Sequence, residues 1–321
     1  MNAFRVLATL ALLAMAALLV AMAVGSIHVP LGALRRVISG ADTGLYTTVV
    51  MDLRLPRALA AFATGGLLAV AGALMQVLLR NPLADPYVLG LSGGAAVAAL
   101  VAMLAGLAGV YVSGAAFVGA LFSTLVVFGL AHGTGSWTPT RLLLTGVVVA
   151  AGWGATINFL LAVSPTAELP GMLYWLMGDM AHAREWAPGL VVLLGLLVIC
   201  LPLGRSLNVL SRGALQARAL GVRVRALEWS VYITASLATA VAVTMAGSVG
   251  FVGLVVPHML RLVIGSDQRL LLPASALLGG TLLVLADTLA RTMIAPEQLP
   301  VGVITALLGV PTFLYLLYRS R

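Results

Sequence analysis

Charged residues divide the chain into long uncharged runs. Cutting the sequence at every Asp, Glu and Arg leaves eight such runs, at 6–34, 58–79, 86–140, 142–167, 186–204, 229–260, 270–286 and 298–318. A helix that crosses a bilayer needs about 20 apolar residues, so each run can hold at least one span. The runs therefore predict an all-α, polytopic membrane protein with a single transmembrane domain over residues 1–321.

Two of the runs are long enough for two spans each. The run 86–140 is expected to turn near Gly106, Gly109 and Gly114, and the run 229–260 is expected to break at 247–250. Ten spans follow. Spans two to five and seven to ten then run in opposite directions, which permits an inverted repeat of four helices plus four, although the two halves show no clear sequence match.

The first run raises the alternative of a cleaved signal peptide, because Ala21-Met22-Ala23 has the small residues of a cleavage site. The apolar segment from Val6 to Val24 is longer than a typical signal-peptide core, and only Arg5 precedes it. A retained first span is therefore predicted.

The arginines predict the orientation. With a cytoplasmic N-terminus and ten spans, twelve arginines lie inside and six outside, as the positive-inside rule requires. The outside group is Arg35, Arg36, Arg54, Arg57, Arg184 and Arg291. Both termini and the connection 205–228 are thus expected on the cytoplasmic side.

Composition supports this class and excludes others. The chain of 321 residues is 61% hydrophobic and 9% charged, with a mean hydropathy of +1.11. A soluble domain carries about 25% charged residues, so a soluble enzyme is excluded. The continuous apolar runs exclude a porin-type barrel, whose strands alternate. The chain contains no lysine and hence no P-loop lysine, so it cannot itself be a Walker-type ATPase.

Candidate chemistry within the chain is sparse. Cys200 is the single cysteine, so no intrachain disulfide forms. The four histidines, His28, His132, His182 and His258, are widely separated and show no metal-ligand spacing. We find no catalytic set and no metal site. The net charge of +8 fits a membrane protein with arginine-rich connections better than a nucleic-acid binder.

The inner connection predicts a compact knob. Leu210, Ala214, Ala217, Ala219 and Leu220 can form an apolar stripe on a short helix. Gly221 stands where a helix C-cap glycine belongs, and a second short helix can begin near Val222. The residues leave two interpretations open: an ordinary surface loop that obeys the positive-inside rule, or a docking knob for a cytosolic partner.

The outer connection ends in Arg-Leu-Pro-Arg at 54–57, with Pro56 suited to the first turn of a helix. Arg54 and Arg57 are expected at the membrane surface, and Arg291 lies at the matching end of the ninth span. These arginines contact either lipid headgroups or an acidic partner. Asp287, near the same end, is expected to face water; the alternative is a proton-relay carboxylate, for which the spans offer no second mid-membrane carboxylate as a partner.

A third break lies at 81–86, where two prolines four residues apart forbid an α-helix. The small residues Gly90, Ser92, Gly93 and Gly94 follow. They allow close backbone packing or the passage of a substrate.

Seven motifs occur in an order that resembles the FecCD-family permeases of type II ABC importers, which serve iron–siderophores, haem and cobalamin. The motifs are Arg-Leu-Pro-Arg at 54–57, Asn-Pro-Leu-Ala-Asp-Pro at 81–86, Arg-Leu-Leu-Leu at 141–144, Tyr-Trp-Leu-Met-Gly at 174–178, Ala-Leu-Gly-Val at 219–222, Gly-Phe-Val-Gly-Leu-Val-Val-Pro-His at 250–258 and Leu-Pro-Val-Gly at 299–302. The resemblance covers nearly the whole chain.

The resemblance implies ten membrane helices and a homodimer in the bacterial inner membrane. It also implies two ATPase subunits, which would bind ATP and Mg, and a periplasmic substrate-binding protein. No cofactor is implied for this chain.

The resemblance also implies roles for particular residues. Arg54, Arg57 and Arg291 match arginines that pair with acidic residues of the binding protein. Asn81 and Leu83 match a cytoplasmic gate, and Thr138, Pro139 and Thr140 match a second gate, where Pro139 departs from the hydroxyl residues of the cobalamin permease. The segment 212–225 matches the ATPase-coupling helices; its coupling residues are Arg212, Gly213, Ala217, Arg218, Leu220, Gly221, Val222 and Arg223.

Two other classes fit the residues less well. A secondary transporter driven by an ion gradient needs buried ionisable residues near the midplane, which the spans lack. An intramembrane enzyme needs a catalytic set. Within the ABC importers we expect haem as the substrate, ahead of siderophores and cobalamin, because the outer arginines with Tyr174 or His182 suit haem propionates or iron.

Overall fold

The computed structural model describes residues 3–25, 27–41, 44–132, 138–181, 183 and 185–319, and all regular structure within them is helical. The helices are α1 (Ala3–Ala23), α2 (Leu31–Ile38), α3 (Leu45–Thr47), η1 (Thr48–Arg54), α4 (Leu55–Leu78), η2 (Pro86–Leu89), α5 (Leu91–Leu104), α6 (Val110–His132), α7 (Pro139–Val163), α8 (Leu169–Met177), α9 (Ala187–Leu210), α10 (Ala214–Ala219), α11 (Val224–Ala246), α12 (Val252–Ile264), α13 (Gln268–Thr292) and α14 (Val301–Arg319). Here η1 is a π-helix and η2 a 3₁₀-helix.

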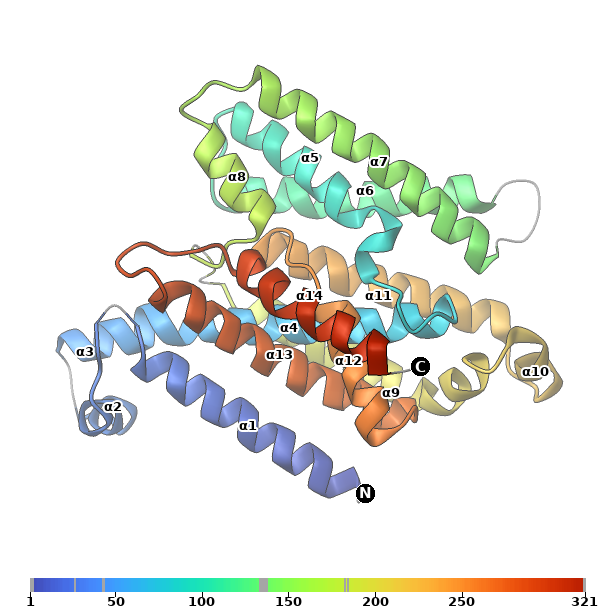
Figure 1. Ribbon diagram of the computed structural model, residues 1–321, viewed down its shortest axis with the longest axis horizontal. Coiled ribbons are helices and arrows are strands. Elements are labelled where there is room, and N and C mark those ends of the chain that lie inside the picture. The colour runs from blue at the N-terminus through green and yellow to red at the C-terminus, as the bar shows by residue number, and fades with distance from the viewer. Residues whose placement is uncertain are drawn as a thin grey trace.

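Seven helical segments in the described part of the chain are long and apolar enough to cross a membrane. They comprise α1, the continuous segment Leu45–Leu78, α6, α7, α9, α11 and α13. Three shorter apolar helices, at Leu91–Leu104, Val252–Ile264 and Val301–Leu316, complete the bundle. Consecutive members of this set run in alternating directions, and both termini lie toward the α10 side, opposite α2 and α3 (Figure 1). The all-helical, polytopic character predicted from the sequence is confirmed.

The core forms around α4, whose residues are buried along most of its length. α13, α11, α12 and α9 pack around it. Glycines permit this contact: a Cβ placed on Gly72 would collide with the carbonyl of Gly253, and one on Gly65 with the carbonyl of Gly279. Membrane helices that lack a hydrophobic driving force between them associate through such small residues.

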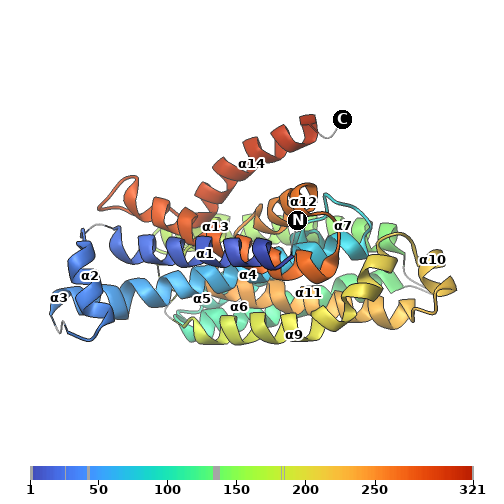
Figure 2. The same cartoon turned by 90° about the horizontal axis from the view of Figure 1, so that it is seen from below.

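Most predicted breaks are confirmed. α5 ends and α6 begins around Gly106 and Gly109, which both have positive φ, while Gly114 lies inside α6. The segment 247–250 separates α11 from α12, and Pro56 lies in the first turn of α4. Figure 2 shows α14 projecting away from the layer of the other helices.

Two predicted boundaries are wrong. α9 continues to Leu210, so the inner connection is shorter than 205–228. No short second helix begins near Val222; the long α11 begins at Val224 instead. Before the first turn of α4, where Pro56 lies as predicted, α3 and η1 continue the helical segment back to Leu45. The predicted boundaries were placed at arginines, because the uncharged runs were cut there. Arginine is a good helix former, so a helix can continue through it.

Candidate functional site

One candidate site is a buried ion-pair cluster of Arg54, Arg57, Asp287 and Arg291, here called the Asp287 cluster. It lies at the end of the bundle opposite α10. Arg57 comes from the first turn of α4, and Asp287 and Arg291 lie one turn apart on α13. Exposed fractions are 9% for Arg57, 1% for Asp287 and 7% for Arg291.

Asp287 binds two guanidinium groups. The Arg57 Nε donates to Oδ2 of Asp287 over 3.0 Å and the Arg57 Nη2 donates to Oδ1 over 2.8 Å, a forked pairing that arginine geometry favours. The Arg291 Nε lies 3.2 Å from Oδ2 of the same carboxylate. Arg57 also donates from Nη1 to Oε1 of Gln298, over 2.7 Å, in the loop before α14.

The cluster also binds the end of α1. Arg54 donates from Nη1 to the carbonyls of Met22 over 2.8 Å and Ala23 over 3.1 Å, and from Nη2 to the carbonyl of Ile27. Arg291 donates from Nη2 to the carbonyl of Ala21 over 3.3 Å. The last carbonyls of a helix have no partner within it and carry partial negative charge, so cations stabilise them.

These contacts correct the sequence-based picture at one point. Asp287 does not face water; it is buried between two arginines, because a buried carboxylate requires compensating charge. The arginines likewise turn toward Asp287 and backbone carbonyls rather than toward lipid headgroups. Three arginines against one aspartate leave the cluster with a net charge of +2 (3 − 1), so it keeps an excess of positive charge. Its pairing with a binding protein stays a prediction.

The second candidate site is the segment between α9 and α11, residues 211–223, here called the α10 knob. Its helix ends in a complete Schellman motif: Gly221 N–H donates to the Arg218 carbonyl over 3.0 Å and Val222 N–H donates to the Ala217 carbonyl over 2.9 Å. Gly221 has a φ of +79°, so the predicted C-cap glycine is confirmed.

The predicted apolar stripe of the knob divides into two faces. Leu210 and Ala217 are buried against the bundle, whereas Leu220 is 71% exposed. Leu215, which the sequence pattern did not single out, is 81% exposed. Arg212, Arg218 and Arg223 are exposed beside these leucines. The knob thus presents two large apolar side chains among cations.

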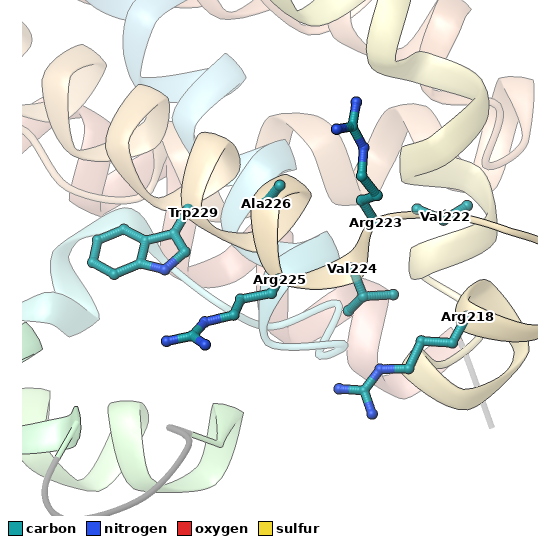
Figure 3. Close-up of a pocket in the computed structure, with 7 residues that line it drawn as sticks. All are labelled: Arg218, Val222, Arg223, Val224, Arg225, Ala226 and Trp229. Carbon is teal, nitrogen blue, oxygen red and sulfur yellow. The ribbon is translucent and has the colours of Figure 1, made fainter.

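A cavity of about 650 Å³ opens where the knob meets α11. Its lining comprises Arg218, Val222, Arg223, Val224, Arg225, Ala226 and Trp229. Figure 3 shows the Arg218 and Arg225 side chains extending to the same side, while Arg223 points the opposite way. Trp229 was missed by the sequence analysis, because only its position in the first turns of α11 brings it beside the arginines.

The knob is tied to α13 on the neighbouring side. Asn208, near the end of α9, donates from Nδ2 to Oδ1 of Asp267 over 2.8 Å, and its own Oδ1 accepts from the Gln268 N–H over 2.7 Å. The Arg269 guanidinium holds the pKa of the Asp267 carboxyl well below its usual value, and Asn208 lowers that pKa further. These bonds fix the end of α9 from which the knob extends.

The first predicted gate segment is a turn. Oδ1 of Asn81 accepts from the Leu83 N–H over 3.0 Å, and Leu83 is 40% exposed. The predicted absence of an α-helix between Pro82 and Pro86 is confirmed, and η2 begins at Pro86. Its N-cap is Asp85, whose Oδ1 accepts from the Tyr87 N–H over 2.8 Å.

The second predicted gate segment is the start of α7. Thr138 is the N-cap and accepts from the Arg141 N–H over 3.3 Å, and Pro139 occupies the first turn, where its missing N–H costs nothing. Thr138 and Thr140 are exposed. The end of α4 and the start of α7 both lie toward the α10 side (Figure 1).

The residues suggested as substrate contacts are only partly described. Tyr174 lies on α8 and is 44% exposed. His182 and Arg184 lie outside the described residues.

Comparison with known proteins decides the family. The model of the FecCD transport family matches residues 12–319. The chain belongs to this family. It is 45% identical to the cobalamin import permease BtuC of Halobacterium salinarum, over 85% of this chain and 74% of that protein. It is 40% identical to the hemin transport permease HmuU of Yersinia pestis, over 84% of this chain and 83% of that protein.

A solved structure agrees. A metal-chelate type ABC transporter in an inward-facing conformation superposes with a TM-score of 0.85 and 29% identity, covering 99% of both chains. The resemblance inferred from the seven motifs is therefore confirmed: this FecCD-family chain is a permease subunit of a type II ABC importer. Permease subunits of this family are not enzymes, and ATP hydrolysis belongs to a separate subunit.

Proposed function

We propose that the chain forms the membrane channel of a homodimeric importer that carries haem from the periplasm to the cytoplasm of a bacterial cell by alternating access. The observation that carries the proposal is the contrast between the two ends of the bundle. One end presents the exposed α10 knob, and the other contains the net-positive Asp287 cluster. An importer needs a different partner on each side of the membrane.

The proposed topology has ten spans, namely the seven long helical segments and the three shorter apolar helices. Their alternating directions and the excess of arginine toward the α10 side support cytoplasmic termini under the positive-inside rule (Figure 1). The α10 knob then lies in the cytoplasm and the Asp287 cluster faces the periplasm. The inverted four-plus-four repeat is compatible with these directions.

The proposed partner of the knob is the ATPase subunit. Leu215 and Leu220 would enter an apolar cleft of that subunit, and Arg212, Arg218 and Arg223 would surround the contact. Interfaces commonly combine an apolar centre with a polar rim. Gly213 and Gly221, both with positive φ, would set the direction of the short helix between α9 and α11.

The proposed partner of the Asp287 cluster is an acidic surface of the periplasmic binding protein. The net charge of +2 would attract carboxylates from a distance, and displacement of Asp287 would free Arg57 or Arg291 for direct pairing. On the α10 side, Asn81 and Leu83 on one segment and Thr138, Pro139 and Thr140 on the other would close the pathway toward the cytoplasm.

The proposed substrate is haem. Support comes from the Yersinia pestis relative, whose name assigns it hemin. Cobalamin is the second candidate, because the relative from Halobacterium salinarum is named for its import and is 45% identical. Both substrates are large metal-bearing macrocycles, so relatives that import either one support the same class of cargo.

The test is to purify the complete complex from its native host and to identify what its binding protein holds. The proposal predicts that an ATPase and a binding protein co-purify with the chain, and that the binding protein shows the Soret absorbance of bound haem. A binding protein that holds cobalamin would support the second candidate instead. A chain that purifies without any ATPase and still transports under an ion gradient would contradict the importer assignment.

A further inference from the structure

An apolar groove of about 550 Å³ lies between α1, α4, α9 and α13. All of its lining residues are apolar, and they include Leu7, Phe62, Leu194, Leu197, Pro273 and Leu277. Its volume is within the range of about 300–1,000 Å³ that is usual for small-molecule sites.

The packing of the helices explains why the groove is present. α1 and α9 both pack against α13 and α4, and Figure 2 shows them on either side of α4. The floor is tight, since a Cβ on Gly66 would lie 2.7 Å from Cδ2 of Leu193. Ala8 and Ala11 on α1 are too small to fill the space above that floor.

The apolar lining of the groove favours a hydrocarbon chain as its occupant. In the proposed topology the groove lies within the apolar part of the bilayer, and its lining offers no polar side chain that could hold water. The lining extends on α9 from Leu190 to Leu197, about 10 Å at 1.5 Å per residue. An acyl chain can follow such a groove along its length.

Two exposed arginines lie beyond the end of the groove on the α10 side, although neither is among its lining residues. Arg5 follows Phe4, a lining residue, and Arg205 lies about two turns beyond Leu197 on α9. Both are exposed, and neither forms an ion pair with an acidic side chain within the described residues. Their charge suits a phosphate at the mouth of the groove.

Arg269 differs from these two arginines. It lies one turn before Pro273, but its Nη2 is 2.7 Å from Oδ2 of Asp267, so its charge is already paired. Its stem closes the space beside α9, because a Cβ on Gly204 would lie 2.6 Å from Cγ of Arg269. Arg5 and Arg205 are therefore the two exposed arginines near this end that have no acidic partner within the described residues.

We propose that this groove binds one anionic glycerophospholipid from the leaflet on the α10 side. An acyl chain occupies the apolar groove, and Arg5 and Arg205 hold the phosphate. The inference rests on the proposed membrane topology but not on the identity of the substrate or of the partners. A lipid, rather than free phosphate, is the occupant because most of the site is hydrocarbon-binding surface.

The experiment measures lipid retention by the purified full-length chain. Native mass spectrometry counts lipids that remain bound after incubation with phosphatidylglycerol or with phosphatidylcholine. We expect one phosphatidylglycerol molecule to be retained in preference to phosphatidylcholine, and excess inorganic phosphate not to displace it. Equal retention of the two lipids, or displacement by phosphate, would overturn the proposal.

Two variant pairs locate the site. Leu194→Trp should fill the groove and abolish retention, whereas Val198→Trp, one turn along the same helix and 72% exposed, should retain the lipid.

Arg205→Gln should reduce the preference for phosphatidylglycerol about fivefold, the effect of one arginine near an anionic headgroup. Arg36→Gln, on α2 at the opposite end, should leave it unchanged. Unchanged retention in Leu194→Trp would show that the lipid binds elsewhere. Since the assay contains no ATPase, binding protein or substrate, its outcome is independent of whether the chain transports haem.

Discussion

The Asp287 cluster and the α10 knob are both rich in arginine, yet their arginines are used in opposite ways. In the cluster the guanidinium groups are buried, and Asp287, Gln298 and the carbonyls at the end of α1 accept their hydrogen bonds. In the knob, Arg212, Arg218 and Arg223 are exposed beside two exposed leucines. The cluster therefore holds helices together, whereas the knob leaves its charges and apolar side chains for a partner. Substitutions at the two sites should affect different properties.

The largest effect is expected from Asp287→Ala. The change leaves Arg57 and Arg291 buried without a counter-charge, and breaking one partner of a buried pair costs about 3–5 kcal/mol. Thermal unfolding in detergent should show a large loss of stability, and Asp287→Glu should restore part of it. If Asp287→Ala unfolds at the wild-type temperature, the cluster does not stabilise the bundle.

A charge in the knob should abolish function without loss of stability. Leu220→Asp places a carboxylate on a side chain that is 71% exposed in the free chain but is proposed to be buried against the ATPase. Co-purification of the ATPase and binding-protein-stimulated ATP hydrolysis should both be lost, while the unfolding temperature stays unchanged. Leu45→Asp, at a similarly exposed leucine on α3, is the control. Wild-type coupling in Leu220→Asp would exclude the knob as the docking surface.

A smaller effect is expected from Gly221→Ala. Gly221 has a φ of +79°, where a Cβ costs roughly 1–2 kcal/mol. Within the described residues, no atom beyond the adjacent residues lies within 4 Å of the added Cβ, so the expected effect comes from the backbone conformation. We expect weaker ATPase affinity, by about tenfold, measured by titrating the ATPase against the reconstituted permease. Gly32→Ala, which also meets open space but has no positive φ, should show no change.

The smallest effect is expected at the exposed pair of Asp267 and Arg269. Their side chains are 42% and 52% exposed, so the pair should contribute little to stability, in contrast to the buried pairs of Asp287. Because the pKa of Asp267 is lowered, its stabilisation is present above the unfolded value near 4 and is lost as the pH falls below that value. Unfolding of Asp267→Asn should therefore differ slightly from wild type at pH 7 and converge with it in acid. A difference as large as that of Asp287→Ala would remove the contrast between exposed and buried pairs.

The sequence predicted the helical spans more reliably than their ends. Long uncharged runs located the spans, and glycines at 106, 109 and 247 located turns, because both signals are local. The continuation of α9 to Leu210 was missed because Arg205 was treated as a boundary, although an exposed arginine is compatible with a helix.

In the candidate sites too, residues with local roles were predicted correctly, whereas residues whose contacts depend on the fold were not. Gly221 and Pro56 have local roles and were predicted correctly. Asp287 was expected in water because its partner Arg57 is 230 residues away in sequence, and no local pattern reveals that α4 and α13 bring them together. Leu215 was missed because its exposure depends on which face of a six-residue helix packs against the bundle.

The claim that the two regions meet partners on opposite sides of the membrane is tested most directly by single-cysteine labelling. Ser39→Cys, on the Asp287-cluster side, and Ser211→Cys, in the knob, are introduced separately into a Cys200→Ala background; Thr43, an alternative outer position, lies outside the described residues. Both serines are exposed, and Cys200 is buried. An impermeant maleimide added to intact spheroplasts should label Ser39→Cys and spare Ser211→Cys until the membrane is opened. Labelling of Ser211→Cys in intact spheroplasts, with Ser39→Cys protected, would reverse the orientation and contradict the account.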